Sequence, residues 1–345
     1  MKPYDPSTDY RRYPTLAPLP EELTGRFARC EGCGGVDFRF RLPDWAAVRK
    51  KCGAKLVLPA QKPASKLTQA APPPKVSAKR ELPNIQIVGA LEHTVLLRPD
   101  GTVRARGNNY YGQCNVSDWS DIVAISAVSG RTTGLRRDGT VVIVGENSSF
   151  HDVSGWSDIT AICTSGLFTA GLRRDGTVLI AGNRYRMEQT KTWSNITQIS
   201  VANNCLVGRY SWGNIVTAGF NCEERLNVKH WSRIRAIAPG LLHLLGLREN
   251  GTVVATGDFQ YNRCEVKGWT NIAALSASYC HSVGLRADGT VVATGDNGND
   301  CCNVQQWTNV SKIWALPSFT AAMQHDGTIL CTNPAMKQWI LDALS

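Results

Sequence analysis

Three cysteines near the N-terminus have the spacing of a metal site. Cys30 and Cys33 form a C-x-x-C pair followed by glycine, and Cys52 lies in "KKCGAKL", which resembles half of a second knuckle. Thiolates in such knuckles bind Zn²⁺, usually through four ligands. The N-terminal segment has only three cysteines, and no histidine precedes residue 93. The site is therefore a degenerate ribbon, is completed by an Asp or water, or is shared between molecules. The alternative is a metal-free, cysteine-bearing β-hairpin.

Other combinations of reactive residues do not complete a known site. The acidic stretch "DNGND" (296–300) lacks the later glutamate that a calcium loop requires. Cys114, Cys264 and Cys302 occupy equivalent places in different copies of a repeat, so one metal ion cannot collect them, and we expect small buried side chains instead. No P-loop or dinucleotide fingerprint appears, and the histidines lack a matched nucleophile. The sequence therefore predicts no enzyme, and no cofactor outside the N-terminal cysteines.

The positive charge of the chain is concentrated at its N-terminal end. The net charge is +10, and nearly all of it comes from residues 1–80. Residues 57–80 are rich in Pro, Ala, Lys and Ser, a composition typical of an extended linker. We therefore predict a basic N-terminal segment (1–56), a flexible linker (57–80) and a larger domain (81–345). Through residues 1–80 the protein could bind nucleic acid or an acidic protein.

The sequence carries no sign of export or of membrane insertion. The apolar runs are all shorter than the roughly 18 residues that a membrane span needs, and the first residues lack the apolar core of a secretory signal. We therefore expect a cytoplasmic protein without a membrane partner. In that compartment its twelve cysteines are expected to be thiols or ligands rather than a disulfide framework.

A glycine recurs at a nearly constant interval through the larger domain. Its seven copies lie 37 or 38 residues apart, at Gly101, Gly139, Gly176, Gly213, Gly251, Gly289 and Gly327. A tryptophan follows six of them by 17 or 18 residues, at Trp119, Trp156, Trp193, Trp231, Trp269 and Trp307. A fixed period of this length indicates a repeat architecture.

Each copy predicts short strands, and no helical periodicity appears. "WTNIAALSA" (269–277), "HSVGLR" (281–286) and "TVVATG" (290–295) are β-type runs, and the last two are joined by an Asp-Gly hairpin turn. "CNVQQW" (302–307) adds a fourth run. Four strands at this period suit a propeller blade, so we predict an all-β, seven-bladed, monomeric propeller. Trp339 follows Gly327 by only 12 residues, and we expect the two ends of the domain to share one blade.

One copy also carries a family likeness. "HTVLLRPDGTVRARGNNYYGQCNV" (93–116) resembles the repeat of the regulator of chromosome condensation family, and its short period is similar to that of bacterial members, such as the type II β-lactamase-inhibitor protein. The resemblance implies a seven-bladed propeller that presents loops to another protein. It names no partner, because members include both a nucleotide-exchange factor and an enzyme inhibitor, and the Gly-Gln pair of the repeat is present only at Gly112-Gln113.

The strand directions predict that two variable loops of every blade share one face. Aromatic, Arg and His residues at these places are candidate anchors for a protein partner. They are Tyr110, Tyr111, Arg131, Phe150, Phe168, Arg184, Tyr185, Arg186, His243, Phe259, Tyr261, Tyr279, His281 and Phe319. The alternative for the His and Phe at the start of the "HSVGLR" run is that they pack locally.

The opposite face carries an arginine three residues before five of the turn glycines. These residues are Arg98, Arg136, Arg173, Arg248 and Arg286, which form either a basic ring or, because Asp residues accompany them, a solvated rim.

The sequence leaves three functional hypotheses. The first is a non-enzymatic protein-interaction module that inhibits, recruits or assembles a partner. The second is a nucleic-acid-associated protein, and the third is guanine-nucleotide exchange on a small GTPase, by fold analogy only.

Overall fold

A computed structural model describes residues 84–345, apart from 147, 149, 203 and 220–225, and the backbone of two short strands nearer the N-terminus. Backbone contacts divide the chain into two units, Met1–Lys79 and Arg80–Ser345. In the first unit, β1 (Phe38–Arg41) pairs with β2 (Ala46–Arg49) in antiparallel fashion. The predicted linker and the cysteines Cys30, Cys33 and Cys52 lie outside the described residues.

The second unit consists of seven antiparallel sheets of three strands, which we number as blades 1 to 7. Blades 1 to 4 are β3–β5 (Gln86–Gly89, His93–Leu97, Val103–Gly107), β6–β8 (Ile122–Val128, Arg131–Arg136, Val141–Gly145), β9–β11 (Ile159–Thr164, Phe168–Arg173, Val178–Gly182) and β12–β14 (Ile196–Ala202, Cys205–Tyr210, Ile215–Ala218). Blades 5 to 7 are β15–β17 (Ile234–Pro239, His243–Arg248, Val253–Gly257), β18–β20 (Ile272–Ala277, His281–Arg286, Val291–Gly295) and β21–β23 (Val310–Leu316, Phe319–Gln324, Ile329–Cys331).

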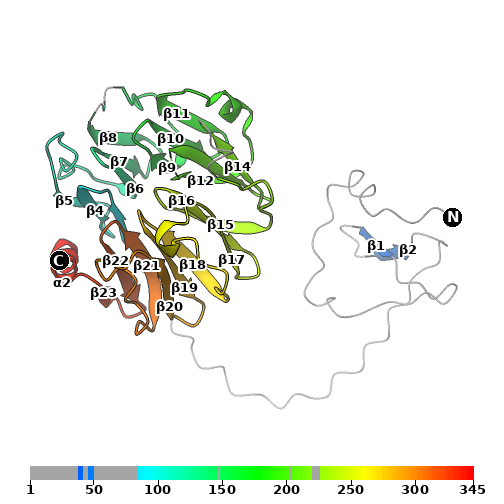
Figure 1. Cartoon of the computed structure of the whole chain (residues 1–345). Helices are drawn as coiled ribbons and strands as arrows, with labels where there is room; N and C mark the ends of the chain where they lie inside the picture. The colour runs from blue at the N-terminus through cyan, green and yellow to red at the C-terminus, as the bar shows by residue number, and fades with distance from the viewer. Residues whose placement is uncertain are drawn as a thin grey trace, which may run out of the picture. The chain divides into compact units, whose positions relative to one another are not determined.

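The first strand of each blade is its inner strand, and the inner strands form a closed ring. Each one contacts the inner strand of the next blade, and β21 of blade 7 contacts β3 of blade 1. The middle strand follows the inner strand, and the turn after it carries the recurring glycine at positive φ, as at Gly101 and Gly289. Figure 1 shows the resulting ring of sheets. The predicted seven-bladed propeller is confirmed.

The predicted fourth strand is wrong. Residues such as 302–307 form consecutive turns. In the described residues of these connections, the turn pattern is interrupted by 3-10 helices η4 (Glu188–Thr192) and η5 (Gln260–Asn262). Each connection runs from one end of a blade to the other, and most of them bury a valine and a tryptophan, as at Val116 and Trp119. Thr190 takes the place of the valine between blades 3 and 4, and Trp307 is half-buried. The alternation in "CNVQQW" therefore reflects burial of single side chains rather than a hydrogen-bonded strand.

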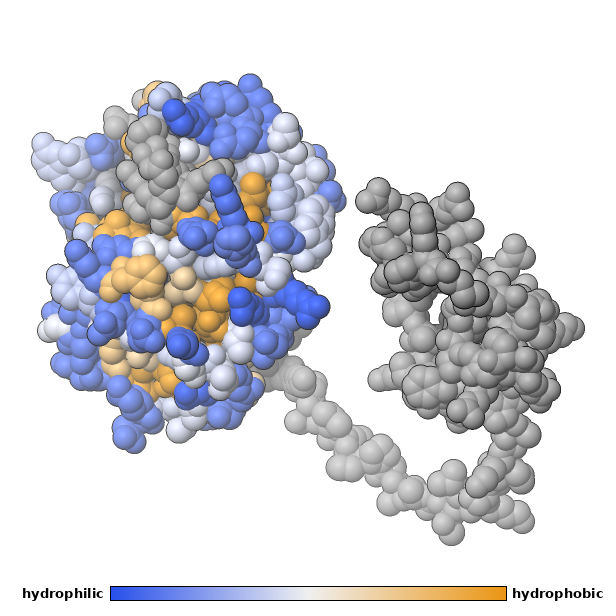
Figure 2. All heavy atoms as spheres, turned by 45° about the vertical axis from the view of Figure 1, so that its right-hand side comes forward, coloured by the Kyte–Doolittle hydropathy of each residue, from blue (hydrophilic) through white to orange (hydrophobic). Residues whose placement is uncertain are grey.

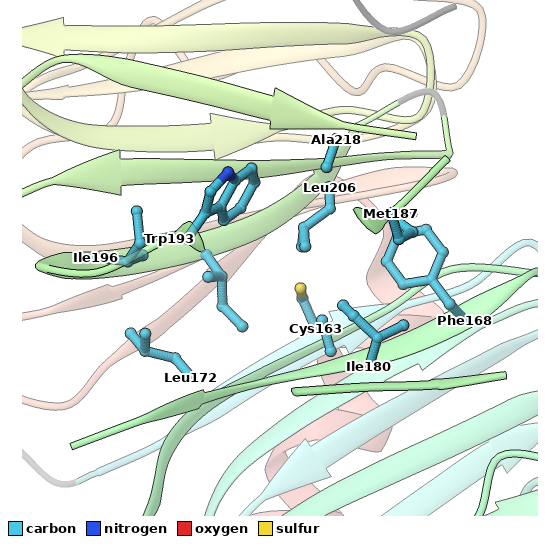
Figure 3. Packing of buried hydrophobic residues seen from close by; sticks show 11 residues of the cluster. Cys163, Phe168, Leu172, Ile180, Met187, Trp193, Ile196, Leu206 and Ala218 are labelled. Atoms are coloured by element: carbon cyan, nitrogen blue, oxygen red, sulfur yellow. The ribbon is translucent and has the colours of Figure 1, made fainter. Parts of the chain in front are cut away.

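The hydrophobic core lies between neighbouring blades rather than within one. In the cluster between blades 3 and 4, Trp193 packs with Leu172 and Ile196, while Phe168 and Met187 lie at the other end (Figure 3). The middle strand carries a glycine opposite the tryptophan, since a Cβ at Gly208 would lie 2.9 Å from Trp193 Cζ3. This confirms that the recurring tryptophans pack between blades.

A C-terminal helix closes the ring, although no helical periodicity was expected there. Helix α2 (Pro334–Leu344) begins where the Asn333 side chain accepts a hydrogen bond from Met336 N (3.0 Å) and Pro334 occupies the first turn. Ile340 and Ala343 join the core between blades 7 and 1. The expectation of a blade shared between the two ends is therefore wrong, because all three strands of blade 1 and of blade 7 are contiguous in sequence.

Candidate functional site

Two sets of loops lie on one face of the propeller. The turn between inner and middle strands and the loop after the outer strand are joined by backbone hydrogen bonds, such as Asn108 N to Glu92 O (2.8 Å) and Asp258 N to Leu242 O (2.9 Å). We call this side the loop face. The opposite side, formed by the turns between middle and outer strands, is the turn face. The predicted convergence of two loops per blade is therefore present in the structure.

Most of the exposed large hydrophobic side chains gather on the loop face. Eleven such side chains are exposed in the part of the chain that the structure describes, and nine of them belong to these loops. The nine are Leu91, Tyr110, Tyr111, Phe150, Leu167, Tyr185, Leu241, Phe259 and Tyr261. The other two are Trp212 in a turn of the turn face and Leu341 in α2. Figure 2 shows, on the face it presents, apolar patches bordered by hydrophilic side chains.

A depression of about 470 Å³ lies at the centre of the ring. The inner strands of all seven blades line it, and the turns that follow them, including Leu91, Leu241 and Tyr279, surround its opening on the loop face. The described residues that line it are all uncharged. Such a surface suits apolar and neutral polar groups and offers nothing to neutralise an ionic ligand.

The exposed aromatic side chains are held in place by their neighbours. Tyr110 and Tyr111 pack edge to face with ring centroids 4.9 Å apart. The Arg263 guanidinium lies 5.5 Å from the centre of the Tyr261 ring. Tyr261 also has a φ of 57°, a backbone conformation that is unusual for a bulky residue. Strained loop conformations of this kind concentrate at functional sites, and ordered side chains lose less entropy when a partner binds.

Some of the predicted anchors are on the surface. Arg184 and Arg186 are exposed beside Tyr185 in the loop after β11, and Tyr279 is half-buried at the central depression. Tyr110, Tyr111, Phe150, Phe259 and Tyr261 are exposed as well. Their role as partner-binding residues stays a prediction, but their side chains are accessible to a partner.

Five of the predicted anchors are buried, so this part of the prediction is wrong. They are Arg131, Phe168, His243, His281 and Phe319, none more than 3% exposed. Each is the first residue of a middle strand, whose side chain enters the junction with the next blade. The alternative, that the His and Phe residues start a strand and pack locally, is confirmed.

The buried histidines link neighbouring blades through a repeated hydrogen-bond network. His93 Nε2 lies 2.8 Å from the hydroxyl of Thr132 in the next blade, and that hydroxyl donates to Gln113 O (2.7 Å). Because the single hydroxyl proton is used on the carbonyl, the network assigns the Nε2–H tautomer to a neutral His93. The same arrangement recurs at His243 with Ser282 and at His281 with Thr320.

Burial keeps these imidazoles uncharged. It lowers the pKa of His93, His243 and His281 from 6.5 to about 4 in each case. The Nδ1 atoms of His93 and His243 have no hydrogen-bond partner among the described residues. These histidines are therefore structural links between blades, and none of them reaches a ligand on the surface.

Arginines at the blade junctions also hold the loops. Arg131 donates to Ser165 O (2.9 Å) in the next blade, and burial lowers the pKa of its guanidinium. Arg263, 2% exposed, donates to Gln260 O (2.9 Å) and Tyr279 O (3.4 Å). Sequence reasoning missed Arg263. Its burial could have been predicted from its position, because Arg263 follows the glycine at the end of an outer strand by six residues, as Gln113 does.

The turn face has the character of a solvated rim. The turn aspartates accept hydrogen bonds from the Thr two residues later, as Asp138 does from Thr140 N (2.9 Å) and Thr140 Oγ1 (2.7 Å). These hydrogen bonds, together with the nearby Arg136, lower the pKa of Asp138. Acidic and basic side chains thus alternate around the rim, which weakens any basic ring.

The described residues hold no group of three His, Cys, Asp or Glu side chains that could bind a metal ion. Burial raises the pKa of Cys264 to about 11 and that of Cys302 to about 12, so both thiols stay protonated. The expectation of free thiols is wrong for Cys205, which is disulfide-bonded. The zinc prediction for Cys30, Cys33 and Cys52 falls outside the described residues.

Along the described chain, the helices are all too short or too polar to cross a bilayer.

Comparisons with known proteins agree with this fold. The model of the regulator of chromosome condensation (RCC1) repeat matches residues 272–301, which lie in blade 6 and the loop after it. A search of curated protein sequences finds no match.

The solved structures include propellers that cover most of this chain. The CRINKLY WD40 ectodomain of the Arabidopsis thaliana receptor kinase ACR4 has a TM-score of 0.55 at 15% identity, covering 72% of this chain and 96% of its own. Prp20p from Saccharomyces cerevisiae, described with its binding to Gsp1p and histones, has a TM-score of 0.53 at 14% identity, covering 75% and 85%. At such identities the likeness shows the fold, and the predicted resemblance is confirmed at that level.

Proposed function

We propose that this protein is a non-enzymatic module that binds another protein through its loop face. The observation that carries the proposal is the distribution of exposed apolar side chains. Nine of eleven lie on this one face of the described chain, around an uncharged central depression. Exposed apolar patches of this kind mark interaction sites, and Tyr and Arg are the residue types that dominate binding energy at protein interfaces.

The loop face also has the variability that recognition needs. The turn glycine recurs in all seven copies and the tryptophan in six, whereas the exposed loop residues differ: two tyrosines in blade 1, Arg184 and Tyr185 in blade 3, and Phe259 and Tyr261 in blade 5. A rigid ring therefore presents an asymmetric surface. The binding of Gsp1p and histones described for Prp20p supports a protein partner for such a fold. The nucleotide-exchange alternative rests on fold likeness alone, and no observation favours it over binding.

The test is affinity capture with the full-length protein as bait in its native host, followed by mass spectrometry. We expect a variant carrying Tyr110→Ala, Tyr111→Ala, Tyr185→Ala and Tyr261→Ala to lose the captured partner at least tenfold, because each buried anchor contributes about 2 kcal/mol or more. Trp212→Ala is the matched control, since that aromatic side chain is 57% exposed on the turn face.

Comparison of the tyrosine variant with Trp212→Ala shows which face of the propeller binds the partner. A partner retained by the tyrosine variant and lost by Trp212→Ala contradicts the proposal and assigns binding to the turn face. Binding that weakens steeply with salt and requires residues 1–80 favours the nucleic-acid alternative instead.

A further inference from the structure

The junction between blades 7 and 1 differs from the other junctions on the loop face. At five junctions the loop after the outer strand inserts one buried residue between two blades. These residues are Gln113, His151, Met187, Arg263 and Cys301, all 5% exposed or less. The loop between blades 4 and 5 includes residues that are not described. At these five junctions the chain thus fills the space between two blades with its own loop.

A hydroxyl group on the next blade receives each inserted segment in three of these junctions. Thr132 donates to Gln113 O (2.7 Å), Ser282 to Arg263 O (2.8 Å) and Thr320 to Cys301 O (2.7 Å). Each hydroxyl also pairs with the histidine of the preceding blade and is fully buried. The inserted loop therefore contacts the junction through one of its own backbone carbonyls, which accepts from the hydroxyl, and through one of its own buried side chains.

In blade 1, the residue equivalent to Thr132, Ser282 and Thr320 has neither a histidine nor a loop carbonyl from the preceding blade 7 as a partner. That residue is Thr94, which is only half-buried. Phe319 replaces the histidine, and the chain continues after β23 into α2 instead of a loop. Within the described residues, no hydrogen bond to the Thr94 hydroxyl is present. A cavity of about 180 Å³ remains, which we call the junction notch. Its lining includes Leu91, Thr94, Pro317, Phe319 and Met336 together with the charged residues Glu92 and Arg106.

We propose that the junction notch receives an extended loop of the protein partner, which replaces the loop that blade 7 lacks. The partner places one neutral side chain between Leu91 and Phe319 and a backbone carbonyl against the Thr94 hydroxyl. The inference rests on the proposed function, since the notch opens on the loop face beside exposed Leu91. Its volume suits one medium side chain, because a cavity of about 150 Å³ holds a benzene molecule.

The chain's own loops indicate which side chain fits. The notch lining combines apolar residues such as Leu91, Pro317 and Phe319 with polar ones such as Thr94 and Ser318. Gln113 and Met187 fill equivalent spaces as neutral groups. Arg263 is a poorer template, because its guanidinium depends on the carbonyls of Gln260 and Tyr279. An acidic side chain would lose hydration in the notch without meeting a net positive charge, since the Glu92 carboxylate lines the notch together with the Arg106 guanidinium.

The experiment uses a synthetic peptide of residues 108–119 with Cys114→Ser (NNYYGQSNVSDW) as the probe, titrated into the full-length protein. We expect the methyl NMR signals of Leu91 and Met336 to shift with weak, saturable binding. Thr94→Val should weaken binding about fivefold through the lost hydrogen bond, and Thr94→Ser should restore it. The peptide with Gln113→Asp should bind at least tenfold more weakly.

Three results would overturn the proposal. The first is the absence of methyl shifts at Leu91 and Met336 up to the solubility limit of the peptide. The second is binding that is equally strong in Thr94→Val. The third is a concentration-dependent dimer, in sedimentation of the protein alone, that Thr94→Val dissociates, since a second copy would then occupy the notch. These outcomes leave capture through Tyr110 and Tyr261 untouched, so failure of the notch is distinct from failure of the loop-face proposal.

Discussion

Single residues set the spacing between blades. In blades 2 to 6, the tryptophan that precedes the inner strand packs against the middle strand of the same blade, where a glycine leaves room for it. A Cβ built at Gly246 would lie 2.6 Å from Trp231 Cζ3 and 2.8 Å from Trp231 Cε3, well inside contact distance. Since Trp231 is itself buried in the core, it cannot move aside. The glycine and the tryptophan therefore recur together in blades 2 to 6, whereas blade 7 has Ala322 at the glycine position.

We expect Gly246→Ala to destabilise the propeller by about 1–3 kcal/mol, the usual cost of overpacking a core. Urea unfolding followed by tryptophan fluorescence measures the change. Gly268→Ala is the matched control, because no atom lies within 4 Å of a Cβ at that position and its backbone is not in the left-handed region. Equal losses in the two variants would contradict the packing account.

At the scale of elements, helix α2 performs the task that a turn-rich connection performs elsewhere. Between most of the other blades a valine and a tryptophan fill the core, whereas between blades 7 and 1 Ile340 and Ala343 enter the cluster formed by Ile85, Leu96 and Leu316. The helix fills the core of this junction but leaves the junction notch open. Helix α2 is thus the reason both that the ring closes and that the junction notch is left open.

We expect Ile340→Ala to cost about 2–4 kcal/mol of unfolding free energy, because it opens a cavity at a fully buried position. Leu341→Ala, one residue further along the same helix, is 41% exposed and should change stability by less than about 0.5 kcal/mol. Chemical denaturation of both variants gives the comparison. Similar values for the two would mean that α2 does not close the ring.

At the scale of the whole molecule, stability is distributed over the junctions. Four of them contain a neutral, buried histidine (His93, His151, His243 or His281) whose folded-state pKa is about 4, below the 6.5 of an exposed imidazole. As the pH falls below 6.5, the unfolded chain takes up protons that the folded chain does not. Stability is therefore full above pH 6.5 and is lost as the pH falls from 6.5 through 4.

We expect the free energy of unfolding to fall between pH 7 and pH 5 by roughly 1–2 kcal/mol for each buried histidine. Denaturation midpoints across this range measure the effect. Replacing His281 by Asn should reduce the slope, and replacing exposed His230 by Asn should leave it unchanged. A slope insensitive to His281 would show that other groups carry the acid response.

The repeated residues of the sequence predict the blades but not the features that depend on the neighbouring blade. The glycine period and the Asp-Gly turns identified seven blades, because a hairpin turn is specified by two adjacent residues. They did not reveal that Arg263 is buried or that Phe319 faces a junction. Variation between copies marked both the exposed Tyr261 and the buried His243 as candidates, since a residue can differ between blades either to meet a partner or to match the next blade.

The sequence by itself determined the propeller, its number of blades and the loops that share one face, since all of these follow from local turns repeated at a fixed interval. The tertiary structure decided which of those loop residues are accessible, how α2 closes the ring, and that Thr94 lacks the partners of Thr132 and Thr320. These features depend on contacts between residues about one blade or a whole ring apart. No local pattern encodes them, because each side of a junction is buried only by the other.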